Sequence, residues 1–247
     1  MKRLFVIIMF FALPLFAQDK TGLTAQQIMT RADSVSTPQT MISTSKQTVY
    51  FYTGRHRQFV MKTWASGGDD NILFEYLKPA RVRGDKFLFL KGGDIWAYFS
   101  KTGRVRRIAS SAKKSKMQGS DFSYEDISMM SSITDDYNSK MMGDAKIDGK
   151  KCYKIELTPN KKISYSKLIA YIDKKNYAMR KIEFYKKDKL LKFLVQRRFK
   201  KVKGYLIAYE TIMQSVKNNT KTEITISDVR VDVKIPAKMF RRNALAK

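Results

Sequence analysis

The chain has 247 residues, of which 43% are hydrophobic, and its 49 basic and 22 acidic side chains give a formal net charge of +27. A single cysteine and a single histidine exclude a disulfide framework and a zinc site built from several such ligands. The length suits one large all-β domain, and the basic balance by itself would suggest a nucleic-acid partner.

The first seventeen residues have the order of a secretory signal peptide. Lys2 and Arg3 precede an apolar run, 4–16, and the small residue Ala17 follows it. The run is shorter than the roughly 20 apolar residues that cross a membrane. We therefore expect cleavage near Ala17 and one exported domain over 18–247. Export argues against nucleic acid as a partner, and basic residues spread along the whole chain favour either transient attraction to a membrane surface or a merely solvated exterior.

Residues 24–34 are predicted to form a short helix. Thr24 and Gln27 have the spacing of a capping box, in which each side chain accepts a hydrogen bond from the backbone N–H of the other residue. Apolar residues follow at helical spacing, and Pro38 ends the pattern because the residue before a proline avoids the helical region.

From about residue 41 apolar residues recur with a period of two, which predicts about eleven short antiparallel strands in one meander. A flat sheet of this width is unusual, so we expect it to curl. The fold class is mainly β: a large curved antiparallel sheet or open β-barrel with an N-terminal helix, a helical lid over one mouth and a terminal helical turn near 236–240. The predicted strands lie at 48–53, 58–64, 71–77, 86–90, 94–99, 104–108, 151–157, 167–173, 179–186, 190–200, 205–213 and 222–233.

The stretch 117–126 reads Met-Gln-Gly-Ser-Asp-Phe-Ser-Tyr-Glu-Asp and stands between the two groups of strands. Together with the Met-rich run 127–130, it predicts a loop that leads into a short amphipathic helix. Its carboxylates are residue types that serve acid–base catalysis or Ca²⁺ binding, but a structural role explains them better.

We expect Ser120 or Asp121 to cap this helix. Glu125 and Asp126 would then occupy its first turns, where the helix dipole favours negative charge. The expected ionic partners come from the preceding strand and are Arg104, Arg106 and Arg107.

Catalysis is poorly supported, and we expect no enzyme activity, no cofactor and no metal. His56 stands between Arg55 and Arg57 at a predicted turn, so a Ser-His-Asp arrangement would depend on a surface residue. Cys152 alternates with apolar neighbours in a predicted strand and is interpreted as a buried packing residue rather than a reactive thiol.

Three segments together resemble the outer membrane lipoprotein-sorting protein family of bacteria, a branch of the LolA/LolB-like superfamily. They are 91–98, 103–109 and 117–126, and the run Gly-Ser-Asp-Phe-Ser-Tyr-Glu-Asp after the Arg-Val-Arg-Arg strand is the most specific of them. The resemblance implies a periplasmic carrier, an open barrel under a helical lid that holds acyl chains in an apolar cavity. It also implies lipoprotein or another membrane lipid as the substrate. Members of this branch are often linked to export pumps of the resistance-nodulation-division type, which makes an inner-membrane transporter an expected partner.

On this interpretation, apolar side chains of alternating strand positions line the cavity, although the alternation leaves open which face of the sheet is concave. The cavity candidates are Phe59, Met61, Phe74, Tyr76, Phe87, Phe89, Trp96 and Tyr98. The lid candidates are Gly119, Ser120, Asp121, Phe122, Tyr124, Glu125, Asp126, Ile127, Met129 and Met130.

Ordinary core packing is the alternative for each of these side chains. At the level of function, the alternatives are a periplasmic partner-binding or sensor domain of the same fold, which would purify without lipid, and a secreted hydrolase. The hydrolase would need a nucleophile and a base, and the sequence offers no convincing pair.

Overall fold

The computed structural model describes residues 22–68, 70–130 and 133–246. The expected signal peptide, 1–17, lies outside the described residues. Two α-helices are present in the described part of the chain, α1 (Ala25–Ser36) and α2 (Tyr124–Met130). The strands are β1 (Thr40–Tyr50), β2 (His56–Ser66), β3 (Asn71–Lys78), β4 (Lys86–Phe89), β5 (Ile95–Phe99), β6 (Arg104–Arg107), β7 (Tyr137–Ile147), β8 (Lys150–Pro159), β9 (Lys167–Asp173), β10 (Met179–Lys186), β11 (Lys189–Val202), β12 (Tyr205–Ser215) and β13 (Thr220–Val231).

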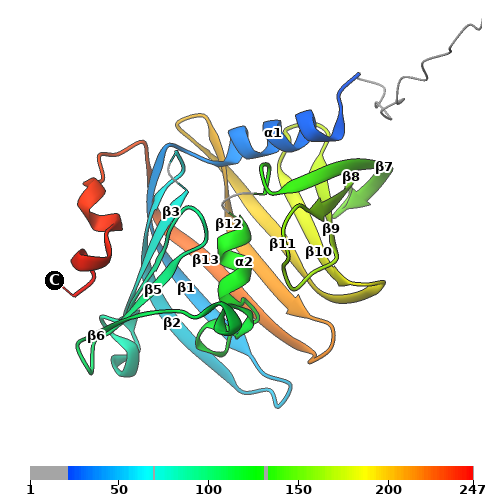
Figure 1. Ribbon diagram of the computed structural model, residues 1–247. Coiled ribbons are helices and arrows are strands. Elements are labelled where there is room, and N and C mark those ends of the chain that lie inside the picture. The colour runs from blue at the N-terminus through cyan, green and yellow to red at the C-terminus, as the bar shows by residue number, and fades with distance from the viewer. Residues whose placement is uncertain (1–21, 69, 131–132, 247) are drawn as a thin grey trace, which may run out of the picture.

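All of these strands form one antiparallel sheet in the order β6-β5-β4-β3-β2-β1-β13-β12-β11-β10-β9-β8-β7. The sheet curves strongly, so that α2 lies inside its curve and α1 lies across one end (Figure 1). The predicted fold class, a mainly β curved open sheet with an N-terminal helix and a helical lid, is confirmed.

The prediction of a single meander was wrong at one place. β1 and β13, the first and last strands, are neighbours in the middle of the sheet, where Tyr50 pairs with Lys221 and Ser45 with Ile226. β6 and β7, which follow each other in the chain, lie at the two opposite edges. The local pattern specifies strands and turns, but which edges meet depends on how the whole sheet curls.

The described sheet has thirteen strands where about eleven were predicted, and two of its strands differ most from the prediction. β1 begins at Thr40, eight residues before the predicted strand 48–53, because its inward positions carry serine and glutamine instead of apolar residues. β7, before the Cys152 strand, was not predicted, since its sequence contains glycine and charged residues and alternates poorly.

The helix α1 begins with the predicted capping box. The backbone N–H of Gln27 donates to Thr24 Oγ1 over 3.2 Å, and the backbone N–H of Thr24 donates to Gln27 Oε1 over 2.9 Å. Ile28 and Met29 are fully buried against strands of the C-terminal half of the sheet. The helix therefore covers part of one end of the curved sheet.

The C-terminal segment packs on the outer face of the sheet. Its two 3₁₀ turns, Ala237–Phe240 and Arg242–Ala244, place Leu245 against Leu73 and Leu88. The predicted terminal helical turn is thus present, and it covers the convex side (Figure 1).

Cys152 is a free, fully buried cysteine, as predicted, and burial raises the pKa of its thiol. Among the residues that the structure describes, no helix combines the length and apolar character needed to cross a membrane.

Candidate functional site

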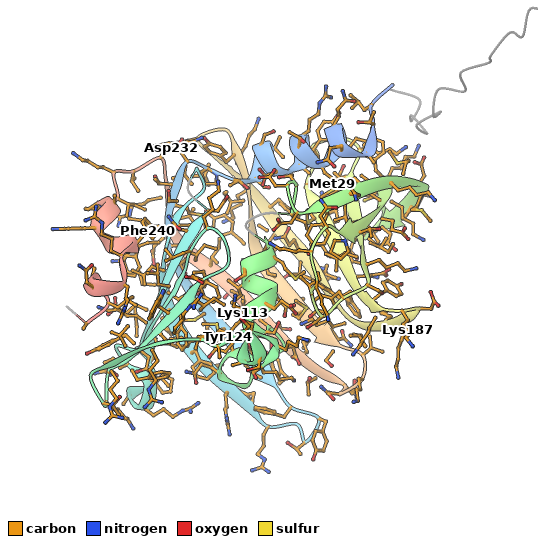
Figure 2. All side chains as sticks on the ribbon, viewed as in Figure 1. Met29, Lys113, Tyr124, Lys187, Asp232 and Phe240 are labelled. Atoms are coloured by element: carbon orange, nitrogen blue, oxygen red, sulfur yellow. The ribbon has the colours of Figure 1, made fainter. Side chains whose placement is uncertain are left out.

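An apolar cavity of about 290 Å³ lies between α2 and the concave face of the sheet. Its floor comes from β1, β2, β3, β12 and β13, and its roof comes from the segment 117–130, here called the lid. Tyr124, at the start of α2, lies inside the curve of the sheet, whereas Phe240 lies outside it (Figure 2). The apolar lining residues are Met41, Met61, Ala65, Ile72, Phe74, Met117, Phe122, Ile127, Met130, Ile224 and Ile226.

A second cavity of about 350 Å³ adjoins the first and reaches the end of α1 at Ser36 and Thr37. The two cavities share part of their lining, namely Met41, Ala65, Ile72, Met130 and Ile226. The two adjoining cavities are together called the groove, which extends from under the lid toward the end of the sheet beside α1. Met130 is the lid residue at the junction of the two parts.

The lid helix starts with a capping box that the prediction placed wrongly. Ser123, not Ser120 or Asp121, caps α2: the backbone N–H of Asp126 donates to Ser123 Oγ over 3.1 Å. In return, the backbone N–H of Ser123 donates to Asp126 Oδ2 over 2.6 Å. The sequence Ser-Tyr-Glu-Asp is therefore a capping box with aspartate in the third helical position instead of the usual glutamate or glutamine.

Asp121 anchors the preceding loop to β13. Its carboxylate accepts hydrogen bonds from Thr220 Oγ1 over 2.6 Å and from Thr222 Oγ1 over 2.9 Å. Lys116 Nζ donates to the same carboxylate over 3.0 Å. Because Asp121 is buried, this set of donors supplies the hydrogen bonds that water would otherwise give it.

Asp126 anchors the first turn of α2 to the opposite half of the sheet. Its carboxylate is fully buried, forms an ion pair with Lys192 of β11 and accepts a hydrogen bond from Tyr165 Oη over 2.7 Å. Burial raises the pKa of Tyr165, and the charge and hydrogen bond of Asp126 raise it further. Glu125 accepts a weaker bond from the backbone N–H of Ser164 over 3.2 Å.

The ionic partners of the lid are therefore lysines, and the predicted pairing with Arg104, Arg106 and Arg107 was wrong. β6 is an edge strand whose arginines point into solvent, and Arg107 instead pairs with Asp94. The curl of the sheet carries β6 away from the first turn of α2 and brings β11 and β13 next to it.

Gly119 allows the backbone of the loop to reverse its direction. Its φ of +77° lies in the left-handed region, which glycine adopts without steric cost, and Gln118 beside it has a φ of 51°. This reversal lets the backbone N–H of Met117 reach the carbonyl of Phe122 over 2.8 Å. Asp121 then faces β13.

The predicted cavity residues fall into three groups. Met61 and Phe74 line the cavity. Four others face the same side but are packed into an aromatic cluster with Tyr124 of the lid. Their ring contacts are edge-to-face, tilted or stacked, with centroids 5.6 to 6.5 Å apart, and the four are Phe59, Tyr76, Phe87 and Phe89.

Trp96 and Tyr98, by contrast, lie on the outer face and do not line the cavity. They pack with the C-terminal segment, where the Arg242 guanidinium lies 4.4 Å from the Trp96 ring centroid. Strand alternation places Ile95 and Ala97 inward and therefore these two aromatics outward.

The apolar lid residues also divide between two sides. Phe122, Ile127 and Met130 line the cavity, whereas Met129 is buried in the core cluster formed with α1 and the C-terminal strands. Sequence reasoning missed Ile224 and Ile226, and also the polar floor of β1, because nothing local shows that β13 lies beside β1.

A family model described as an uncharacterized protein matches residues 68–247 of the chain. No curated protein matches it.

Solved structures resemble the chain over nearly its whole length. A DUF1329 family protein from Desulfovibrio piger ATCC 29098 is 28% identical with a TM-score of 0.84, covering 90% of this chain and 97% of that one. A domain assigned to outer membrane lipoprotein-sorting proteins, from Vibrio parahaemolyticus, is 26% identical with a TM-score of 0.81, covering 90% and 98%. A LolA superfamily protein from Nitrosomonas europaea, 22% identical with a TM-score of 0.75 and covering 90% and 99%, shares the fold.

Proposed function

Since the chain belongs to the outer membrane lipoprotein-sorting family, a branch of the LolA/LolB-like superfamily, we propose that it is a periplasmic carrier of acyl chains. In this proposal the mature domain, 18–247, takes up the lipid part of a lipoprotein or another membrane lipid and moves it between membranes. Binding and release are sufficient for this role, so the proposal assigns no catalytic step.

The observation that carries the proposal is the groove itself. Under the lid it is lined mainly by methionine, isoleucine and phenylalanine, and it is roofed by the lid instead of being filled by core side chains. Toward α1 the lining is mixed, with Asp33, Asp70 and Asn71 beside apolar residues. Cavities of a few hundred Å³ with such a lining are typical of sites for apolar ligands. Met61, Met117 and Met130 add flexible side chains that adapt to a chain without a fixed shape.

The free energy of exposing an acyl chain to water explains why a carrier needs an apolar groove. An acyl chain of about sixteen carbons loses roughly 0.8 kcal/mol for each CH₂ that is exposed to water, on the order of 12 kcal/mol in all. An apolar groove offsets most of this cost during the crossing. Release requires that the groove hold the chain no more tightly than a bilayer does.

The lid supports the same function because its polar anchors lie at its start. Asp121 and Asp126 fix its loop and the first turn of α2 to the sheet, whereas Met130 at the other end makes apolar contacts along the groove. We propose that ligand enters beside Met130, at the mouth near α1. An inner-membrane transporter of the resistance-nodulation-division type is the proposed partner for loading or unloading.

The test is native mass spectrometry, with lipid extraction, of the mature protein purified gently from a bacterial periplasm. The expected result is a discrete added mass that resolves into acylated species. A clean apoprotein mass that stays unchanged after incubation with lipid vesicles would contradict the carrier function and favour a partner-binding domain of the same fold.

A further inference from the structure

A row of polar side chains runs along the floor of the mainly apolar part of the groove, under the lid. Ser43, Ser45 and Gln47 alternate along β1, so all three face the concave side, and they line the cavity. Only 3%, 4% and 4% of these residues is exposed. Thr63 of β2, which pairs with Ser43 across the sheet, extends the row.

The side chains of Ser43, Ser45, Gln47 and Thr63 make no hydrogen bond to another described residue, and they are accessible from the cavity that they line. Buried polar groups in folded proteins are nearly always hydrogen-bonded. On the neighbouring strand β13, Thr220 and Thr222 are also buried, and both donate to Asp121. The row on β1 has no such partner in the protein, and its polar groups face the space where a ligand would lie.

The surroundings show which part of a ligand the row would meet. Across the sheet, Ser45 pairs with Met61 on one side and with Ile226 on the other, so apolar side chains flank the row. Ser43 and Gln47 stand four residues apart, roughly 13 Å along an extended strand. This span is too long for one head group at the end of the groove, and it faces the enclosed portion of a ligand.

We propose that the groove selects acyl ligands that carry hydrogen-bonding oxygen, an ester carbonyl or a hydroxyl group, in the part that is enclosed. The inference rests on the proposed carrier function and names its ligand class. The Gln47 amide donates to a carbonyl or accepts from a hydroxyl, and the hydroxyls of Ser43 and Ser45 do either. A plain alkyl chain would leave these groups unpaired, and a site built to hydrogen-bond a ligand rejects the analogue that lacks the matching group.

The experiment measures dissociation constants of the delipidated mature protein for two matched pairs of ligands. The first pair is 12-hydroxystearic acid and stearic acid, which differ in one hydroxyl group on the chain. The second pair is 1-stearoylglycerol and its ether analogue 1-O-octadecylglycerol, which differ in the ester carbonyl. We expect the oxygenated member of at least one pair to bind about five- to tenfold more tightly, the value of one net hydrogen bond. The pair that responds identifies the source of the oxygen.

A triple variant, Ser43→Ala, Ser45→Ala and Gln47→Met, tests the row directly. We expect the preference to fall to within about twofold while stearic acid binds as well as before or better, because no polar group is then left unpaired. The matched control, Thr44→Ala with Thr48→Val, changes the outer face of the same strand and should keep the preference.

The experiment distinguishes failure of this inference from failure of the proposed carrier function. If the protein binds both members of each pair equally well, the row is satisfied by water and the inference is overturned, while the carrier function stands. If it binds none of the four ligands, the carrier function itself fails. The comparison within each pair uses the natural protein, so it holds even where a variant does not fold.

Discussion

Lys192 joins the lid to the far half of the sheet. Its ammonium group pairs with the Asp126 carboxylate and donates to the backbone carbonyl of Asp121 over 3.2 Å. Only 12% of the Lys192 side chain and none of the Asp126 side chain is exposed. The rings of Tyr165 and Phe184 lie 5.5 Å from the ammonium group and shield it further. Two charges removed from water in this way depend on each other, so losing one leaves the other uncompensated.

Lys192→Met should therefore reduce the free energy of unfolding by about 3 to 5 kcal/mol, as measured by urea denaturation. Adding Asp126→Asn should restore part of the loss, because the buried carboxylate is then no longer charged. Arg107→Met, which breaks an exposed ion pair with Asp94, is the control and should change stability by at most about 1 kcal/mol. Equal effects for the two single variants would contradict the structural role of Lys192.

Tyr165 makes the free energy of unfolding depend on pH in the alkaline range. Its folded-state pKa is raised above the ordinary value of about 10, by burial and then by Asp126, so its contribution is present below pH 10 and is lost as the pH rises through the folded-state pKa. We expect unfolding free energies at pH 9 to 11 to fall with pH, and Tyr165→Phe to make that slope shallower by up to about 1.4 kcal/mol per pH unit. An unchanged slope in the variant would show that this hydroxyl already ionises in the folded state.

At the scale of elements, α2 is a helix that the sheet stabilises. Seven residues are too few for an isolated helix to persist in water. The capping box and the contacts of Asp121 and Asp126 hold its start. Its two apolar faces have different roles. Met129 packs into the core, whereas Met130 and Ile127 roof the groove.

This division separates stability from ligand binding at two adjacent residues. Met129→Ser should lower the free energy of unfolding by about 2 to 5 kcal/mol, because it removes a buried side chain and leaves a cavity. Met130→Ser should change stability far less and should lower the fraction of protein that retains bound lipid in native mass spectrometry. A double variant would confuse the two effects, so the single variants are compared. Loss of lipid from Met129→Ser alone, with Met130→Ser unaffected, would contradict the groove assignment.

At the scale of the whole molecule, two hairpins meet at the end of the sheet opposite α1. β1 pairs with β13, so the β1–β2 turn and the β12–β13 turn lie side by side (Figure 1). They carry exposed apolar side chains, Tyr52 at 79% and Val216 at 48% exposure, next to the exposed cations Arg55, Arg57 and Lys217. An aromatic ring among cations is the combination that contacts an anionic membrane surface.

We expect the mature protein to bind vesicles that contain anionic lipid, with affinity falling as salt rises, since surface charge is screened within about 8 Å at physiological ionic strength. Replacing Arg55, Arg57 and Lys217 by glutamine should weaken binding by about 1 kcal/mol per charge, roughly fivefold each, in vesicle sedimentation. A control variant with three exposed cations of β6 replaced, Arg104, Arg106 and Arg107, keeps the same net charge. If both variants lose binding equally, the attraction comes from overall charge and not from the hairpins.

The sequence by itself determined the fold class, α1 with its capping box, most strands, and the position of the lid. These features are local: a period of two, turn residues and capping spacings act within a few residues of each other. It also identified Met61, Phe74, Phe122, Ile127 and Met130, because large apolar residues at alternating or lid positions are the natural candidates for a lining.

The tertiary structure alone decided which edges of the sheet meet and which face is concave. Pairing β1 with β13 brings Ile224, Ile226 and the anchors of Asp121 to the lid, over separations of about a hundred residues that no local pattern encodes. The same curl turns Trp96 outward beneath the C-terminal segment. It also turns Ser45 toward the groove, although a polar residue in a strand is ordinarily expected to face solvent. The alternation of side chains along a strand separates the two faces of the sheet but does not show which face is concave. Only the packing of distant segments decides which face encloses the groove.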